Sequence, residues 1–270
     1  MYQLVVTRLS ESGAKIVLTL NKGSPFHWTK RELIDPLTSE DGIYLDSDLN
    51  QNPGISDQTK RFFNRTLFGH WKKRLLHNQW AAATGLVYPS AVVIPHVTEV
   101  PRRVECSVDY GIGTVTCAQW WGLFGDQWIA FDEYYWDSNE QGHQRTSGEH
   151  AQAIVNRRKC SKFIIDPTAA ALKVDMRRLG AKVQNGKNDI LLGVQACETS
   201  FQERKIAISE ACSQLVIQVG QLVWDENAQL RGEDRPVKDE DHATDSMRYW
   251  VMSKYPPHGG LSVTQKPPGM

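Results

Sequence analysis

Three β-rich runs joined by short glycine-containing connections begin at Val104, and they constrain the fold more than any other part of the 270-residue chain. β-Branched and aromatic residues dominate each of the runs, which read VECSVDYGIG, TVTCAQWWGLF and QWIAFDEYYWD. Connections this short join neighbouring antiparallel strands. The sequence therefore predicts a sheet that starts with three consecutive antiparallel strands.

Helix-like and strand-like segments alternate after these runs. SGEHAQAIVNRRK has the serine start and basic end of a helix, and KFIIDPTAA is a short apolar run typical of a buried parallel strand. Further helices and short strands continue to about residue 255. The order βββ-α-β-α-β-α-β-α-α predicts a mixed α/β domain over residues 104–255, a ribonuclease H-like mixed sheet flanked by helices.

The first ninety residues follow a different pattern. KIVLTL (15–20) has the composition of a β-strand and ends in a turn cluster, but no partner strand accompanies it. Apolar residues recur at helical spacing over 56–85, and prolines 89, 95 and 101 follow. We expect residues 1–90 to form a separate part, 104–255 the main domain and 256–270 a flexible tail rich in proline and glycine.

Composition excludes several classes of protein. Lys and Arg (31) balance Asp and Glu (31), and no run of about 18 apolar residues or signal peptide is present, so we expect no membrane association and a location in the cytoplasm. The five cysteines form no C-x-x-C pair, which argues against a disulfide framework or structural zinc.

Three aspartates occupy chemically suggestive positions. Asp109 ends the first β-run, Asp166 ends the apolar strand and Asp245 lies near the start of the last helix. Because adjacent strands lie about 4.8 Å apart, carboxylates at neighbouring strand ends can share divalent ions. Carboxylate oxygens suit Mg²⁺ or Mn²⁺, and two such ions can activate water for hydrolysis of a phosphodiester.

Each aspartate also has a purely structural interpretation. A strand-end aspartate often forms a turn, and Asp241 could simply cap the last helix. Asp241 and Asp245 are four residues apart and share a helix face, where their charges repel unless cations bind them. Glu133, on the third β-run, is expected to face outward or pair with a lysine.

Several stretches resemble one protein family. They are VDYGIGTVT, WIAFDEYYW, FIIDPTAAAL and VKDEDHATDSMRYWV, together with TLNKGSPFHW (19–28) and GHWKKRLLHNQWAAATGLVYP. Up to about residue 255 the chain resembles the large terminase subunits of tailed bacteriophages, the motors that package DNA. TLNKGSPFHW is similar to the coupling segment that ends the ATPase domain of this family, with Lys22 where the family has proline.

The resemblance implies a function and a site. It implies an endonuclease that cleaves double-stranded phage DNA during packaging with two Mg²⁺ or Mn²⁺ ions, leaving a 3′-hydroxyl and a 5′-phosphate. Asp109, Asp166 and Asp245 match the family's metal-binding carboxylates, and His242 matches a histidine that orients a carboxylate or a water. Asp241 is a weaker metal-site candidate. The portal protein and the terminase small subunit are the implied protein partners.

Part of the family pattern has no match in this sequence. No G-x-x-x-x-G-K-[ST] phosphate loop occurs, and no apolar strand ending in Asp-Glu precedes residue 15. The chain therefore resembles the C-terminal nuclease domain of a terminase together with a partial P-loop ATPase segment, and we expect no ATPase activity from it.

Three alternatives remain open. The stretch from Asp109 to Thr114 is similar to the D-x-G-x-G-T loop of sugar kinases and actin-like ATPases, which need a second such loop where this chain has Asp166-Pro167-Thr168. Transposases and integrases share the predicted fold but use a glutamate, and here Asp175 is the nearby acid and comes too soon. The chain could also be a non-catalytic prophage remnant that docks to portal or packaging proteins.

Overall fold

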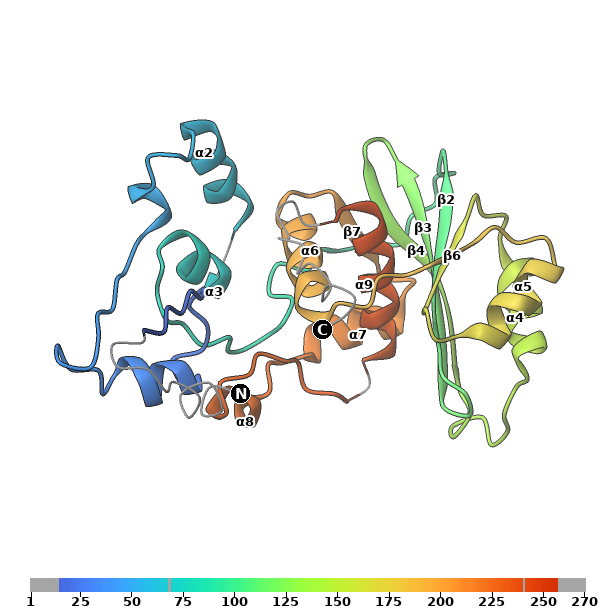
Figure 1. Ribbon diagram of the computed structural model, residues 1–270. Helices are drawn as coiled ribbons and strands as arrows, with labels where there is room; N and C mark the ends of the chain where they lie inside the picture. The colour runs from blue at the N-terminus through green and yellow to red at the C-terminus, as the bar shows by residue number, and fades with distance from the viewer. Residues whose placement is uncertain (1–14, 68, 240, 257–270) are drawn as a thin grey trace, which may run out of the picture.

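The computed structural model describes residues 15–67, 69–239 and 241–256, and a mixed sheet forms its centre (Figure 1). The sheet order is β1-β7-β4-β3-β2-β5-β6, with antiparallel pairing between β2 and β3 and between β3 and β4 and parallel pairing elsewhere. The strands are β1 (Val93–Ile94), β2 (Val104–Tyr110), β3 (Val115–Phe124), β4 (Gln127–Asp137), β5 (Phe163–Ile165), β6 (Val183–Asn185) and β7 (Ile206–Ser209). The predicted α/β fold and its three-stranded antiparallel start are confirmed.

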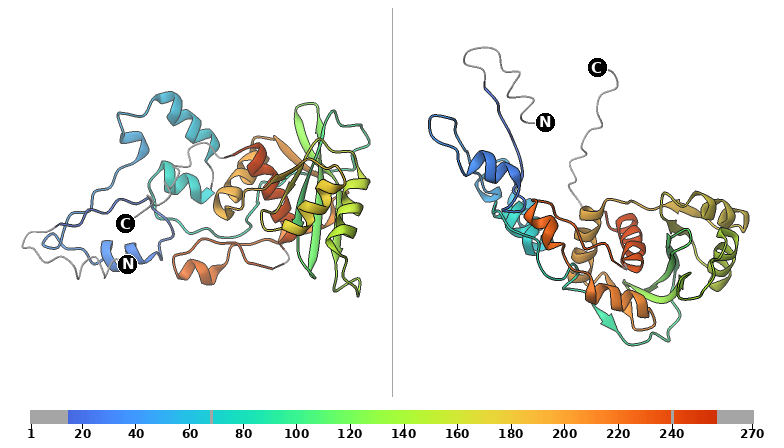
Figure 2. Two further views of the ribbon diagram at one scale, coloured as in Figure 1. Left: turned by 45° about the vertical axis from the view of Figure 1, so that its right-hand side comes forward. Right: turned by 90° about the horizontal axis from the view of Figure 1, so that it is seen from below.

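Helices cover both faces of this sheet (Figures 1 and 2). One face carries α4 (Ser147–Arg157) and α5 (Ala170–Arg178). The other carries α6 (Ile190–Gln202), α7 (Ser213–Gln221) and α9 (His242–Lys254), while α8 (Glu226–Leu230) lies in the connection before α9. All three residues of β5 are buried, as the apolar run predicts, because helices cover both sides of that strand.

Helix α9 is fixed against the sheet by aromatic and charged contacts. Trp250 stacks on Trp121 of β3 with ring centroids 4.4 Å apart, and its Nε1 donates to the carboxylate of Glu105 at 3.0 Å. Glu105 is fully buried, and Arg103, Lys162 and Lys254 neutralise its charge. A buried carboxylate with this many partners is strongly held, so it fixes α9 on β2 and thereby places the start of α9.

A glycine allows α6 to approach α9 closely. A Cβ atom at Gly193 would lie 2.4 Å from Cγ of Arg248, which is closer than two carbon atoms can come. The stem of Arg248 therefore occupies the space above Gly193, and this contact holds the guanidinium beside the first turns of α9.

The N-terminal part forms short helices and turns that dock on the segment between α7 and α9. Its elements are η1 (Thr29–Ile34), η2 (Leu49–Gln51), α2 (Asp57–Thr66), α3 (Gly69–Trp71) and η3 (Lys72–Leu76). The Ser24 hydroxyl donates to the Gln229 carbonyl at 3.2 Å, and buried Arg74 pairs with Asp234. The helical spacing over 56–85 thus corresponds to α2, α3 and η3.

The strand predicted over residues 15–20 is wrong. This segment pairs with no strand of the described chain, and 84% of Val17 is exposed. A β-strand gains its backbone hydrogen bonds from a neighbour, so an apolar run alone does not form one. The tail expected over 256–270 lies outside the described residues except for residue 256.

The connection between the two parts is packed at its start and open at its end. Val87 and Tyr88 are buried in the main core, and β1 extends the sheet beside β7. Residues 98–100 are exposed, with 91% exposure for Val100. In the part of the chain that the structure describes, no helix is long and apolar enough to cross a membrane.

Limited proteolysis should detect this connection. Endoproteinase Glu-C is expected to cut first after Glu99, because exposed backbone outside a sheet enters a protease cleft most easily. The fragment starting at Val100 should then resist further digestion longer than residues 15–90, as mass spectrometry of a time course can establish. First cuts within α6, α7 or α9 would contradict this division of the chain.

Candidate functional site

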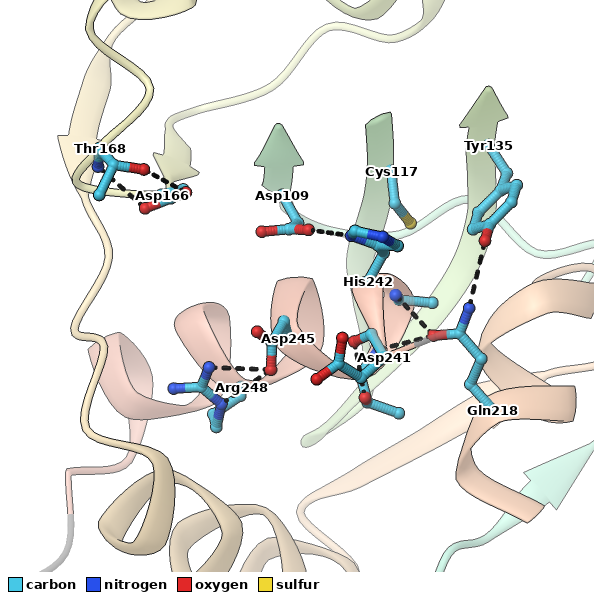
Figure 3. A network of polar contacts seen from close by, with 12 residues as sticks. Asp109, Cys117, Tyr135, Asp166, Thr168, Gln218, Asp241, His242, Asp245 and Arg248 are labelled. Atoms are coloured by element: carbon cyan, nitrogen blue, oxygen red, sulfur yellow. Dashed lines mark hydrogen bonds and ion pairs between the residues drawn. The ribbon is translucent and has the colours of Figure 1, made fainter. Parts of the chain in front are cut away.

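Two of the predicted aspartates lie side by side at the carboxyl ends of parallel strands (Figure 3). The parallel register pairs Val108 of β2 with Ile165 of β5, so Asp109 and Asp166 follow at the same level, and the Asp166 N–H donates to the Val108 carbonyl at 3.1 Å. Side chains at matching positions of parallel strands point to the same face. Both residues are mostly buried, with 8% and 9% exposure.

The start of α9 brings a histidine to this edge. Nδ1 of His242 lies 2.9 Å from Oδ2 of Asp109 (Figure 3). The hydrogen bond to Asp109 raises the pKa of His242, and the Asp109, Asp241 and Asp245 charges add to that effect against the cost of burial. This contact is the one that a carboxylate-orienting role for His242 requires.

Asp245 lies one turn further along α9. Its pKa is raised to about 6, mainly by burial and in addition by the carboxylates of Asp241 and Asp109, while the Arg248 guanidinium opposes them. Arg248 donates to Oδ1 of Asp245 at 2.8 and 3.2 Å and is itself 1% exposed. The charges of Asp109, Asp241 and Asp245 therefore act on one another, as expected for carboxylates that share one site.

The structural interpretation of Asp166 is also realised. Its Oδ1 accepts from the Thr168 N–H at 2.9 Å and its Oδ2 from the Thr168 hydroxyl at 2.7 Å, which is the pattern of an Asx turn. The turn directs both oxygens toward the chain. This turn is compatible with a ligand role for Asp166, because each carboxylate oxygen keeps a second lone pair that can face a cation.

Asp241 is positioned as the N-cap residue of α9, but its side chain makes no capping hydrogen bond. The interpretation of Asp241 as a side-chain cap of the last helix is therefore wrong. Its backbone carbonyl accepts the first helical bond, from the Asp245 N–H at 2.8 Å.

Sequence reasoning missed Tyr249, which lies one turn after Asp245. Burial raises its pKa well above the ordinary range, and the charges of Asp109, Asp245 and Asp166 raise it further. The hydroxyl thus stays protonated within the field of all three carboxylates. Tyr249 comes four residues after Asp245 and therefore shares its helix face, and this spacing is the signal that the sequence offered.

Glu133 differs from its expected position. It is neither directed outward nor paired with a lysine, because its carboxylate accepts the backbone N–H groups of Gln214 and Leu215 at 2.8 and 3.0 Å. These N–H groups begin α7 and have no partner within that helix, so an acceptor from β4 serves them. Burial raises the pKa of Glu133.

The donors suit a hard divalent cation, but they do not surround a single point. Among the residues that the structure describes, no three Asp, Glu, His or Cys side chains are grouped closely enough to hold one ion. Oxygen donors, mutual repulsion and partial burial all favour Mg²⁺ or Mn²⁺ at this edge. The residues therefore fit such an ion in chemistry, and binding requires the side chains of Asp109, Asp166 and Asp245 to approach one another.

No protein-family model matches the chain. It is similar to the terminase large subunit of Escherichia phage T5, with 26% identity over 129 residues that span 45% of this chain and 30% of that protein. The solved large terminase of a thermophilic bacteriophage superposes with a TM-score of 0.81 at 29% identity, covering 93% of this chain. The complex of that same terminase with ATP-gamma-S gives a TM-score of 0.82 at 30% identity.

The chain spans just under two thirds of the thermophilic phage terminase, 66% of its length. The similarity includes both the N-terminal part and the sheet domain, since together these make up nearly all the described residues. The resemblance carried by the motifs is confirmed: the chain belongs to the family of bacteriophage terminase large subunits.

Proposed function

We propose that this chain is a metal-dependent endonuclease that cleaves double-stranded phage DNA during genome packaging. The observation that carries most weight is the placement of Asp109 and Asp166 at matching ends of neighbouring parallel strands, with Asp245 near enough for the Asp109 charge to raise its pKa. Membership of the terminase family supports DNA as the substrate. Two Mg²⁺ or Mn²⁺ ions are the proposed cofactors.

Asp109, Asp166 and Asp245 would hold the ions, with Asp241 adjacent. When bound, such ions activate water and stabilise the leaving oxygen of a phosphodiester, which yields a 3′-hydroxyl and a 5′-phosphate. The protein's own side chains set up this arrangement. His242 orients Asp109, and Arg248 holds Asp245 and offsets its charge.

Nicking of supercoiled plasmid by the full chain tests this function. With Mn²⁺ or Mg²⁺ the chain should convert supercoiled DNA to nicked and linear forms, and chelation with EDTA should stop the reaction. Products should be ligatable without phosphorylation, as a 5′-phosphate allows. No cleavage with either metal would favour instead a non-catalytic role in docking to packaging proteins.

The portal protein and the terminase small subunit are proposed as partners on the strength of family membership alone. They remain separate from the nuclease proposal, because the cleavage test uses DNA and metal without either protein.

We expect this chain by itself to release no phosphate from ATP. The thermophilic phage terminase has been solved with ATP-gamma-S and with ADP, but no phosphate-loop motif occurs in these 270 residues. Without that loop, no row of backbone N–H groups cradles the phosphates. Phosphate release should stay at the level of a buffer blank with and without DNA, and turnover that persists through repurification would contradict this.

A further inference from the structure

The first turn of α9 is capped by a side chain from another helix. Oε1 of Gln218, on α7, accepts the N–H groups of Ala243 and Thr244 at 2.7 and 3.3 Å (Figure 3). Its Nε2 points to the hydroxyl of Tyr135 at 3.4 Å, and Gln218 is 4% exposed. Gln218 thus satisfies donors that the N-cap residue of a helix ordinarily serves.

Other helices of this chain use their own N-cap aspartate, among them α6 and α8. Asp189 accepts from the Leu192 N–H at 2.8 Å to begin α6, and Asp225 accepts from the Ala228 N–H at 3.0 Å to begin α8. Both have the extended backbone of a capping residue, with ψ of 118° and 105°. Asp241 has ψ of 8° and no capping bond, so its backbone does not direct the carboxylate to the helix start.

We propose that Gln218 is a positioning residue that caps α9 in place of Asp241 and so leaves the Asp241 carboxylate available to the metal site. This inference rests on the proposed nuclease function for its consequence, although the capping itself does not. A glutamine suits the task because its amide oxygen accepts the two N–H groups without adding a charge beside Asp241, Asp245 and Asp109.

Gln218 is itself held in place from the sheet. Glu133 of β4 caps the start of α7, the helix that carries Gln218. Gln119 of β3, paired with Glu133 in the strand register, donates to the Ala243 carbonyl at 2.8 Å. Both sides of the first turn of α9 are therefore fixed by glutamines attached to the rigid part of the fold.

Thermal melting of four metal-free proteins tests the capping. In the full chain, Asp241→Ala should leave the melting temperature unchanged or raise it, because the carboxylate caps nothing and repels its neighbours. Gln218→Met removes the acceptor at nearly constant size, and we expect the backbone of Asp241 to turn to the extended conformation in which its carboxylate caps the helix instead. In that background, Asp241→Ala should lower the melting temperature by about 2–4 °C, the usual effect of losing a cap in a domain of this size. Equal effects of Asp241→Ala in both backgrounds overturn the inference.

Mn²⁺ titration by calorimetry tests the consequence for the site. Gln218→Met should weaken Mn²⁺ binding about tenfold, as loss of an outer contact commonly does. Asp225→Ala, which removes the cap of α8, should lower the melting temperature and leave Mn²⁺ binding unchanged. Unchanged affinity in Gln218→Met overturns the positioning role.

The two proposals fail separately in these measurements. Wild-type protein that binds no Mn²⁺ would refute the proposed metal-dependent nuclease, while the melting cycle would still decide whether Gln218 caps α9 in place of Asp241. Conversely, the wild type could bind Mn²⁺ and nick DNA while Asp241→Ala changes the melting temperature equally in both backgrounds. That result would refute the capping role alone.

Discussion

Asp166→Asn is expected to reduce Mn²⁺-dependent nicking by about 10⁴-fold, the scale on which loss of one essential catalytic group acts. The substitution removes a charged ligand while an amide oxygen can still accept the Thr168 N–H, so the turn after β5 should persist. Plasmid nicking by the purified variant measures the loss, with Asp175→Asn as the matched control. Asp175 precedes the end of α5 and pairs with Ser147 and Arg178.

The melting temperature separates a ligand role from a folding role. Metal-free Asp166→Asn should melt no lower than the wild type, because one negative charge has left a crowded edge. If Asp166→Asn nicks DNA at the wild-type rate, Asp166 is not a metal ligand. A large fall in the melting temperature of this variant would show instead that the turn after β5 depends on the Asp166 carboxylate.

Mn²⁺ affinity is expected to fall about tenfold for each pH unit below about 6. The pKa of Asp245 is raised to about 6 by burial and by neighbouring carboxylates, and the protonated acid must release its proton before an ion binds. Calorimetry between pH 4.5 and 7.5 measures how the Mn²⁺ affinity changes with pH. Asp245→Asn should weaken Mn²⁺ binding and also make it less dependent on pH. A wild-type affinity independent of pH over this range would contradict the assignment.

The metal-free protein should show the opposite dependence. Because the folded pKa of Asp245 lies above its ordinary value of 3.8, its contribution to stability is present below about pH 4 and is lost as the pH rises through about 6. The raised pKa of His242 acts in the same direction at higher pH. Added Mn²⁺ should therefore raise the melting temperature more at pH 7.5 than at pH 5.

Local sequence patterns predicted the elements that depend on local chemistry. The antiparallel runs from Val104 and the buried strand before Asp166 were found because alternation, turn residues and apolar composition act over a few residues. Asp109 and Asp166 could be paired because parallel strands present their ends at one edge. The start of α9 near Asp241 was likewise found from its local signals.

Contacts between distant residues could not be predicted in this way. Glu133 caps a helix that starts some eighty residues later, and Gln218 caps α9 through the N–H of Ala243, 25 residues later. Neither residue type at those positions signals a partner, because the contact depends on how β4, α7 and α9 pack. The prediction of a strand over residues 15–20 was wrong for the converse reason, because a strand-like composition forms no strand without a neighbouring strand.

A crystal of the full chain soaked in Mn²⁺ tests the central claim most directly, by the anomalous scattering of the ion. We expect anomalous density at coordination distance from oxygens of Asp109, Asp166 and Asp245. Density confined to other surfaces at a saturating Mn²⁺ concentration would contradict the proposed site.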